Sequence, residues 1–207
     1  MESSKIFDIT YNDYLPQIKD FDFSKKAEIL GIQKQNQSFM FEFFNRQIVF
    51  DRNDFKDITG KELTFAVKVV LCKYLLMCPE KISKSSNRLV TFREFANAGP
   101  LFSSFTANTN KIIETTFSGE LETLKMRCRK LGGTMMETKS YDLSVRFRAL
   151  PMIPIILNFN DKDELLPAKA GFLYHDNAET YLDLECLTIT CTYLTGLLIQ
   201  SSLNNIL

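Results

Sequence analysis

Residues 143–159, LSVRFRALPMIPIILNF, decide the fold class of this chain. Apolar and polar residues alternate over 143–150, which is typical of a strand with one buried face. Residues 152–159 are almost continuously apolar, which predicts a strand buried on both faces and nearer the centre of a sheet. Pro151 separates the two runs. The C-terminal half therefore contains the centre of a predicted β-sheet.

A β-hairpin is predicted nearer the N-terminus. Two β-prone runs, 38–44 and 47–51, flank a turn at Asn45-Arg46. The hairpin is crowded with phenylalanine: Phe39, Phe41, Phe43, Phe44 and Phe50. Strand alternation cannot point all of these rings to one face. We expect helices to bury both faces, and the alternative is an apolar ligand pocket or a dimer surface.

Helical spacing of apolar residues recurs along the rest of the chain. It predicts helices within 11–31, over 62–77, over 101–117 and over 120–131, with Gly31 and Gly132-Gly133 as C-terminal stops. Residues 184–199 are ambiguous, because they alternate like a strand and also repeat apolar residues at three and four. Strands seldom run much beyond ten residues, so length favours a helix there.

These elements predict an α+β fold, with a mixed, largely antiparallel sheet built from the hairpin and the C-terminal strands and helices packed on it. We expect a single domain over residues 1–207, with a polar internal linker near 81–88. The predicted order of helix, hairpin and helix precedes the strands at 143–159.

Composition narrows the classes of function. The 207 residues carry 25 lysines and arginines and 25 aspartates and glutamates, so the formal net charge is zero. A neutral chain is not expected to bind nucleic acid or an anionic membrane surface. Five cysteines without a close pair, and an N-terminus without a signal-like apolar run, predict a cytoplasmic protein. Nucleotide-binding and serine-hydrolase motifs are absent from the sequence.

A recognisable string of residues follows the predicted strands. The acidic segment 161–168, DKDELLPA, is followed by LYHDNA at 173–178 and then by Tyr181-Leu182 and Glu185. This string resembles the family called domain of unknown function 3786, with matching segments upstream at 91–95 and 131–133. The resemblance implies an uncharacterised family found mainly in anaerobic prokaryotes, and its name contains no function. His175 stands where the family has an acidic residue, which is a departure from the pattern.

The acidic segment carries the first candidate site. Asp161 and Asp163 could bind a hard cation through their carboxylates, with His175 as a further ligand or proton carrier. Asp176 follows His175 and belongs to the same polar group. The alternative interpretation is a solvated acidic turn before an N-capped helix.

Two further groups of polar residues are candidates. Tyr181 and Glu185, four residues apart, could form a tuned acid–base pair or a structural hydrogen bond. Three arginines could bind an anionic ligand, or could belong to a solvated face: Arg127, Arg146 and Arg148.

The sequence patterns favour a non-catalytic cytosolic binding or accessory module. The resemblance implies that this module acts beside anaerobic metabolism. Its partner would be a small molecule or a protein, with homodimerisation as a further option. The alternative is a metal-assisted enzyme built on 161–164 and His175. No motif identifies a cofactor or a bound metal.

Overall fold

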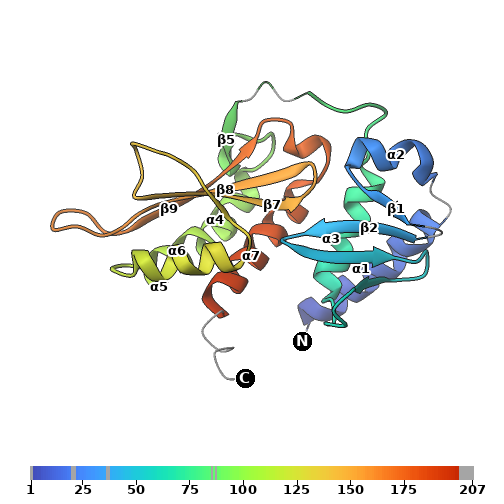
Figure 1. Ribbon diagram of the computed structural model, residues 1–207, viewed down its shortest axis with the longest axis horizontal. Helices are drawn as coiled ribbons and strands as arrows, with labels where there is room; N and C mark the ends of the chain where they lie inside the picture. Colours follow the sequence, from blue (N-terminus) through green and yellow to red (C-terminus); the bar gives the residue numbers. More distant parts are fainter. Residues whose placement is uncertain (1, 20–21, 36–37, 85, 87, 201–207) are drawn as a thin grey trace. The chain divides into compact units, whose positions relative to one another are not determined.

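The two runs at 143–159 form strands, as the sequence predicts, and the strands pair as neighbours. In the computed structural model, which describes residues 2–19, 22–35, 38–84, 86 and 88–200, they form β7 (Leu143–Leu150) and β8 (Ile153–Asn160). β8 occupies the centre of its sheet, so its predicted central position is confirmed. Helices and two antiparallel sheets confirm the α+β class (Figure 1).

The chain folds into two compact units. The first unit consists of Met1–Ser86, Ala149–Ile153 and Asn177–Thr190, and the second of Asn87–Arg148, Pro154–Asp176 and Cys191–Leu207. The boundary after Ser86 falls within the predicted linker at 81–88. Each unit takes segments from both halves of the sequence. The expectation of a single domain over 1–207 stays a prediction.

A four-stranded meander forms the sheet of the first unit, in the order β1-β2-β3-β4. The elements of this unit are α1 (Glu2–Lys19), α2 (Phe23–Leu30), β1 (Gln33–Gln35), β2 (Ser38–Phe43), β3 (Arg46–Phe50), β4 (Phe55–Asp57), α3 (Phe65–Leu76) and η2 (Ala178–Thr180). Gly31 follows α2 with a φ of 65°, which confirms the predicted stop. α3 begins after Thr64, whose side chain accepts a hydrogen bond from the Val67 N–H.

The hairpin forms as predicted, but its turn lies one residue earlier. Phe43 pairs with Arg46, so the turn residues are Phe44 and Asn45 rather than Asn45 and Arg46. Both have positive φ, 46° and 62°, as a type I′ turn requires. The Phe44 N–H donates to the Ala149 carbonyl, and the ring is buried. Burial of the ring and this hydrogen bond offset the unfavourable backbone conformation of Phe44.

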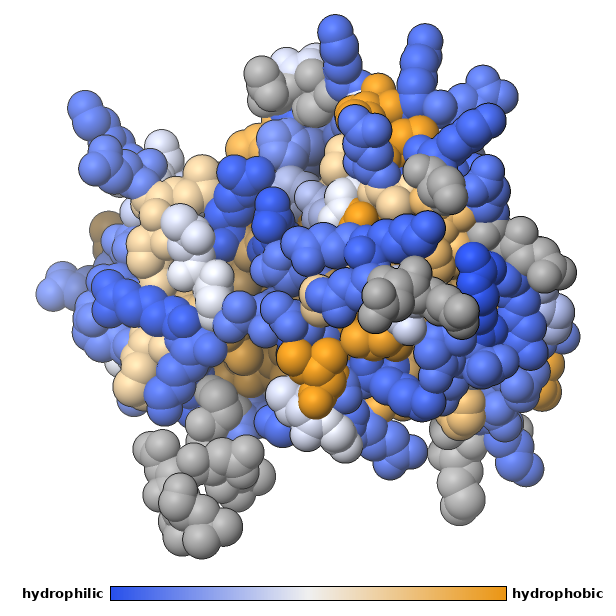
Figure 2. Space-filling model, turned by 45° about the vertical axis from the view of Figure 1, so that its right-hand side comes forward, coloured by the Kyte–Doolittle hydropathy of each residue, from blue (hydrophilic) through white to orange (hydrophobic). Residues whose placement is uncertain are grey.

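The phenylalanines of the hairpin belong to the core of the first unit. All five are at most 3% exposed. Phe39 lies opposite Phe50 in the register, and Phe23 of α2 stacks on Phe39 with ring centroids 3.8 Å apart. The predicted burial is confirmed, so these rings offer no exposed surface to a ligand or a second copy. On the face drawn in Figure 2, hydrophilic residues predominate and hydrophobic residues emerge in small patches.

The carboxylate of Asp57, at the end of β4, is buried. The Asp57 side chain is only 1% exposed and accepts a hydrogen bond from Arg46 Nε at 2.6 Å. It also accepts from the Thr59 N–H at 2.7 Å and the Thr59 hydroxyl at 2.6 Å. Burial by itself would raise the pKa of Asp57, but these hydrogen bonds outweigh it and hold the pKa below its usual value.

The pKa values of two carboxylates in the first unit lead us to expect that the fold loses stability in acid. Asp54 resembles Asp57: burial acts to raise its pKa, and hydrogen bonds from Lys68 and Tyr11 lower it overall. Groups with a depressed folded pKa stabilise the fold above their unfolded pKa of about 3.9, and this contribution is lost as pH falls through the folded values. We expect the urea midpoint, followed by far-UV circular dichroism, to hold from pH 7 to 5 and to fall below about pH 4. Asp57→Asn should flatten this dependence, and equal wild-type midpoints at pH 7 and pH 3 would contradict it.

Strands in the order β5-β9-β8-β7-β6 form the sheet of the second unit. Its other elements are β5 (Leu89–Thr91), η1 (Phe92–Glu94), α4 (Gly99–Asn108), α5 (Asn110–Thr116), α6 (Leu121–Lys130), β6 (Thr134–Met135) and β9 (Lys169–His175), and the last helix is α7 (Leu184–Gln200). α5 packs along β9 (Figure 1), and α6 contacts β6.

One topological prediction is wrong. The hairpin and the C-terminal strands do not share a sheet, because the hairpin strands pair with β1 and β4 while β8 pairs with β7 and β9. β1, β4, β6 and β9 were absent from the prediction. Three of these four are two or three residues long, too short to show a periodicity.

The helices of the second half follow the sequence with one interruption. The predicted helix over 101–117 divides at Thr109, where φ and ψ are −129° and −81° and the hydroxyl donates to the Phe105 carbonyl. Gly132 follows α6 with a φ of 78°, as predicted. The helix prediction for 184–199 is confirmed by α7. None of the described helices combines the length and the hydropathy needed to cross a bilayer.

Candidate functional site

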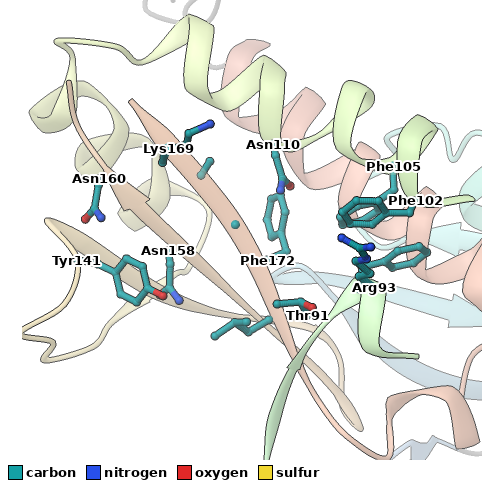
Figure 3. Close-up of a pocket in the computed structure, with 14 residues that line it drawn as sticks. Thr91, Arg93, Phe102, Phe105, Asn110, Tyr141, Asn158, Asn160, Lys169 and Phe172 are labelled. Carbon is teal, nitrogen blue, oxygen red and sulfur yellow. The ribbon is translucent and has the colours of Figure 1, made fainter. Parts of the chain in front are cut away.

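A cavity of about 330 Å³ lies at β9 in the second unit (Figure 3). Strands β8 and β9 contribute one part of its wall, and η1, α4 and the start of α5 contribute another. Its aromatic and polar lining includes Phe92, Phe102, Phe105, Phe172, Tyr141, Arg93, Asn110, Asn158, Asn160 and Lys169. Figure 3 shows Asn158, Asn160 and Tyr141 to one side of β9, and Phe102, Phe105 and Arg93 to the other.

Stacked phenylalanines make the apolar side of the cavity. Phe92 and Phe105 lie almost parallel, with ring centroids 4.2 Å apart and an interplanar angle of 5°. Phe172 of β9 meets Phe105 edge to face at 6.3 Å. Arg93 holds its guanidinium 5.5 Å from the ring centroid of Phe102. Phe92, Phe105 and Phe172 are at most 2% exposed, so they belong to the core of the unit, and of these four rings only Phe102 keeps exposed surface at the cavity.

Strand register determines the polar side. Asn158 lies opposite Gly171, and Asn160 lies opposite Lys169. Side chains directly across an antiparallel pair share a face, so these four positions line the same side of the sheet. Gly171 leaves a gap among them, since a Cβ added there would have no atom within 4 Å. The missing side chain opens the hollow beside the two amides.

Both asparagines have one end of the amide fixed. The Oδ1 atom of Asn158 accepts from the Ser144 hydroxyl at 2.7 Å, and that of Asn160 accepts from the Asp142 N–H at 3.0 Å. Among the described residues, neither Nδ2 group makes a hydrogen bond. Asn158 is only 5% exposed, but its Nδ2 group is not among the described fully enclosed polar atoms that lack a partner. This donor therefore keeps accessible surface, where water or a ligand can reach it.

Two cations and no carboxylate belong to the described lining of this cavity. Lys169 is exposed on β9 and forms no ion pair within the described chain, and Arg93 is exposed on η1. The cavity that holds these two positive charges adjoins a second hollow, which shares Asn160 and Lys169 with it and carries Asp142, Asp161 and Asp163.

The predicted acidic pair lines a neighbouring hollow of about 520 Å³, together with Asp142, Asn160 and Lys169. Asp161 Oδ1 accepts from the N–H groups of Gly119 and Lys162 at 2.6 and 2.7 Å. Asp163 Oδ1 accepts from the Leu165 and Leu166 N–H groups at 2.7 and 2.8 Å, which lowers its pKa. Asp163 thus supports its own turn, whereas Asp161 also connects this segment to Gly119, 42 residues away in sequence.

No described group of three or more histidine, cysteine, aspartate and glutamate side chains is arranged to hold a metal ion. Of the predicted ligands, His175 pairs with Leu89 at the far end of β9, and the Asp176 N–H donates to the Arg88 carbonyl. The metal-site hypothesis for 161–164 and His175 stays a prediction.

The other predicted residues have structural contacts. Tyr181, in the first unit, is fully buried, and its hydroxyl accepts from the Ser83 N–H at 2.8 Å. Glu185, in the same unit, is exposed, and the described contacts include no hydrogen bond between the two. Arg127 donates to the Leu198 carbonyl at 2.8 Å, at the C-terminal end of α7. The remaining arginines, Arg146 and Arg148, are exposed on one face of β7.

Sequence reasoning missed the polar residues of the cavity. Asn158 and Asn160 interrupt the otherwise apolar run of β8, and such asparagines in a central strand were a usable signal. Lys169 and Gly171 carried no comparable signal, because their place depends on pairing between β8 and β9.

The fold and the site define an α+β protein whose second unit holds a cavity along β9, with buried phenylalanines on one face of the sheet and Asn158 and Asn160 on the other. The chain belongs to the family described as Domain of unknown function (DUF3786), whose model matches residues 22–196. The resemblance drawn from residues 161–185 is thereby confirmed. No curated protein and no solved structure matches the chain.

Proposed function

We propose that this protein is a binding module for a small organic molecule, which occupies the cavity at β9. The observation that carries the proposal is the nearly buried Asn158 amide, whose Nδ2 group has no described partner and borders the gap above Gly171. The cavity volume of about 330 Å³ lies at the small end of the range for ligand sites, roughly 300–1,000 Å³. We place the protein in the cytoplasm, since all five cysteines are free thiols.

A role in binding is favoured over thiol catalysis. Burial raises the pKa values of Cys72, Cys128 and Cys191 to about 12. A thiol with so high a pKa is almost wholly protonated at neutral pH and is a poor nucleophile. None of the described residues that line the cavity is a cysteine or a histidine. The geometry therefore supports recognition without covalent chemistry.

Filling the gap beside Gly171 should weaken binding. Gly171→Leu places a side chain in the hollow, where the added Cβ has no atom within 4 Å, so the variant should fold normally. We expect saturation-transfer NMR to detect binding of small aromatic probes, 3-phenylpropionate and 3-phenyl-1-propanol, to the wild type. Affinity should fall at least about tenfold in Gly171→Leu, because the leucine occupies the ligand's space.

Gly99→Leu is the matched control. Gly99 begins α4, is exposed, and also leaves an added Cβ without neighbours within 4 Å, but it does not line the cavity. The control should bind the probes as the wild type does. Equal binding by Gly171→Leu and the wild type would refute the cavity as the binding site.

A further inference from the structure

We propose that the exposed face of α1 is a homodimer interface, in which the α1 helices of two copies lie antiparallel about a twofold axis at Ile9. Exposed residues at helical spacing make up this face, among them Lys5, Ile6, Ile9, Asn12, Asp13 and Gln17. α1 belongs to the first unit and precedes residues 22–196, which the family model matches. This surface is separate from the cavity at β9, and its role does not depend on the cavity.

Two isoleucines form the apolar part of this face. Ile6 and Ile9 are each 62% exposed, although burial of an isoleucine is favourable. They lie three residues apart, so their side chains are neighbours on the helix. Among the other described helices, none carries two exposed large hydrophobic residues, since α3 has Phe65 alone and α6 has Met126 alone. α1 packs against α3 (Figure 1), and the two isoleucines remain largely outside that contact.

The charges on either side of Ile9 fit a second copy of the same helix. Lys5 lies four residues before Ile9 and Asp13 four residues after it, so all three share one face. Lys5 and Asp13 are about 12 Å apart along the helix axis, too far to pair within one chain. None of the described ion pairs involves either side chain. In an antiparallel pair centred on Ile9, Lys5 of each copy faces Asp13 of the other.

These charges also select the orientation and the register of the two helices. A parallel pair would set Lys5 against Lys5 and Asp13 against Asp13, which is repulsive. An antiparallel pair centred between Ile6 and Ile9 would place Lys5 opposite Thr10 and leave Asp13 without a cation. The pair centred on Ile9 brings two isoleucines together at the axis and places an ion pair on each side of them. Charge complementarity therefore favours this arrangement.

The arrangement fixes which positions of the two copies meet. Packed helix axes are about 8–10 Å apart and Cα atoms lie about 2.3 Å from each axis, so the two Cα atoms of position 9 should be about 5 Å apart. This distance lies within the range that a disulfide spans, about 4.4–6.8 Å. Position 17 is eight residues from the twofold axis, so its two copies should be about 24 Å apart. A cysteine at position 9 should therefore crosslink, and one at position 17 should not.

Cysteine variants of the full chain test this geometry under mild oxidation. We expect Ile9→Cys to give a covalent dimer on non-reducing gel electrophoresis. Gln17→Cys, at an exposed position on the same face, is the matched control and should stay monomeric. The wild type gives the background, because four of its five cysteines are buried. Equal crosslinking of the two variants, or no crosslinking of Ile9→Cys, would overturn the proposal.

Charge exchange tests the two ion pairs by sedimentation equilibrium at low salt. We expect the wild type to dimerise with a Kd of roughly 0.1 mM, since one pair of helices buries less than the roughly 1,200 Å² of a standard interface. Lys5→Asp should raise the Kd at least about fivefold by setting acid against acid, and the double variant Lys5→Asp/Asp13→Lys should restore it to within about twofold.

Lys19→Asp is the control for the charge exchange. Lys19 is an exposed lysine of the same helix, ten residues from the proposed axis, so its replacement should leave the Kd unchanged. Far-UV circular dichroism checks that each variant is folded. A wild type that stays monomeric at 1 mM, or a double variant that dimerises as weakly as Lys5→Asp, would refute the antiparallel pair.

Discussion

Tyr74→Ala is expected to lower the free energy of unfolding by about 4 kcal/mol, because a large buried ring is lost and leaves a cavity. Tyr74 is a fully buried residue of α3. Its hydroxyl donates to the Leu30 carbonyl at 2.7 Å and accepts from the Met152 N–H at 3.1 Å. One side chain thus connects three segments of the first unit that are far apart in sequence: α3, the end of α2 and the segment Ala149–Ile153.

Tyr74→Phe separates the ring from the hydroxyl. It keeps the ring volume and leaves the Leu30 carbonyl and the Met152 N–H without this partner, so the expected loss is about 1–2 kcal/mol. Urea unfolding of the wild type and both variants, followed by far-UV circular dichroism, gives the two values. A loss below 1 kcal/mol for Tyr74→Ala, or equal losses for the two variants, would contradict this account of the residue.

Gly133→Ala is expected to destabilise the second unit by about 3 kcal/mol, the upper end of the usual cost of overpacking a core. An added Cβ would lie 2.6 Å from Val145 Cγ1, 2.8 Å from Phe147 Cε1 and 2.9 Å from the Cys128 carbonyl oxygen. Val145 and Phe147 are buried, and the carbonyl already accepts from the Gly133 N–H, so none of these atoms can move freely.

Gly171→Ala provides the matched comparison in the same sheet. Its added Cβ meets no atom within 4 Å, and replacing glycine in a strand reduces the entropy of the unfolded chain. We expect its melting temperature to equal or slightly exceed that of the wild type, while that of Gly133→Ala falls by several degrees. A Gly133→Ala protein as stable as the wild type would show that the α6 end can move away from β7.

Local patterns were sufficient where the determining residues are contiguous. The alternation over 143–150 and the apolar run that follows predicted β7 and β8, and helical spacing with a glycine stop predicted α6. For residues 184–199 two periodicities competed, and length favoured the helix that the structure contains. Thr188 and Thr190 are accommodated there because their hydroxyls donate to the carbonyls of Leu184 and Cys186.

In the hairpin, such local patterns predicted the strands but not the position of the turn. Its strands were predictable from composition, but the turn shifted by one residue because Phe44 is buried in the core in a left-handed conformation. Turn propensity favoured Asn45-Arg46, and tertiary packing of Phe44 overrode it. The phenylalanine-rich sequence of the hairpin did not decide whether these rings are buried or exposed. Their packing against α2 decided it.

The sequence by itself determined the α+β class, most of the longer elements and the family. Each of these depends on the order and spacing of neighbouring residues. Only the tertiary structure decided that the strands form two sheets, and that Asn158 and Asn160 face Gly171 and Lys169 across β8 and β9. The candidate acidic residues were conspicuous in sequence, yet the described contacts engage Asp163 in its own turn and Asp161 with the N–H group of Gly119, 42 residues away. A cavity depends on which strands pair and in which register, and these are contacts between residues that no local period relates.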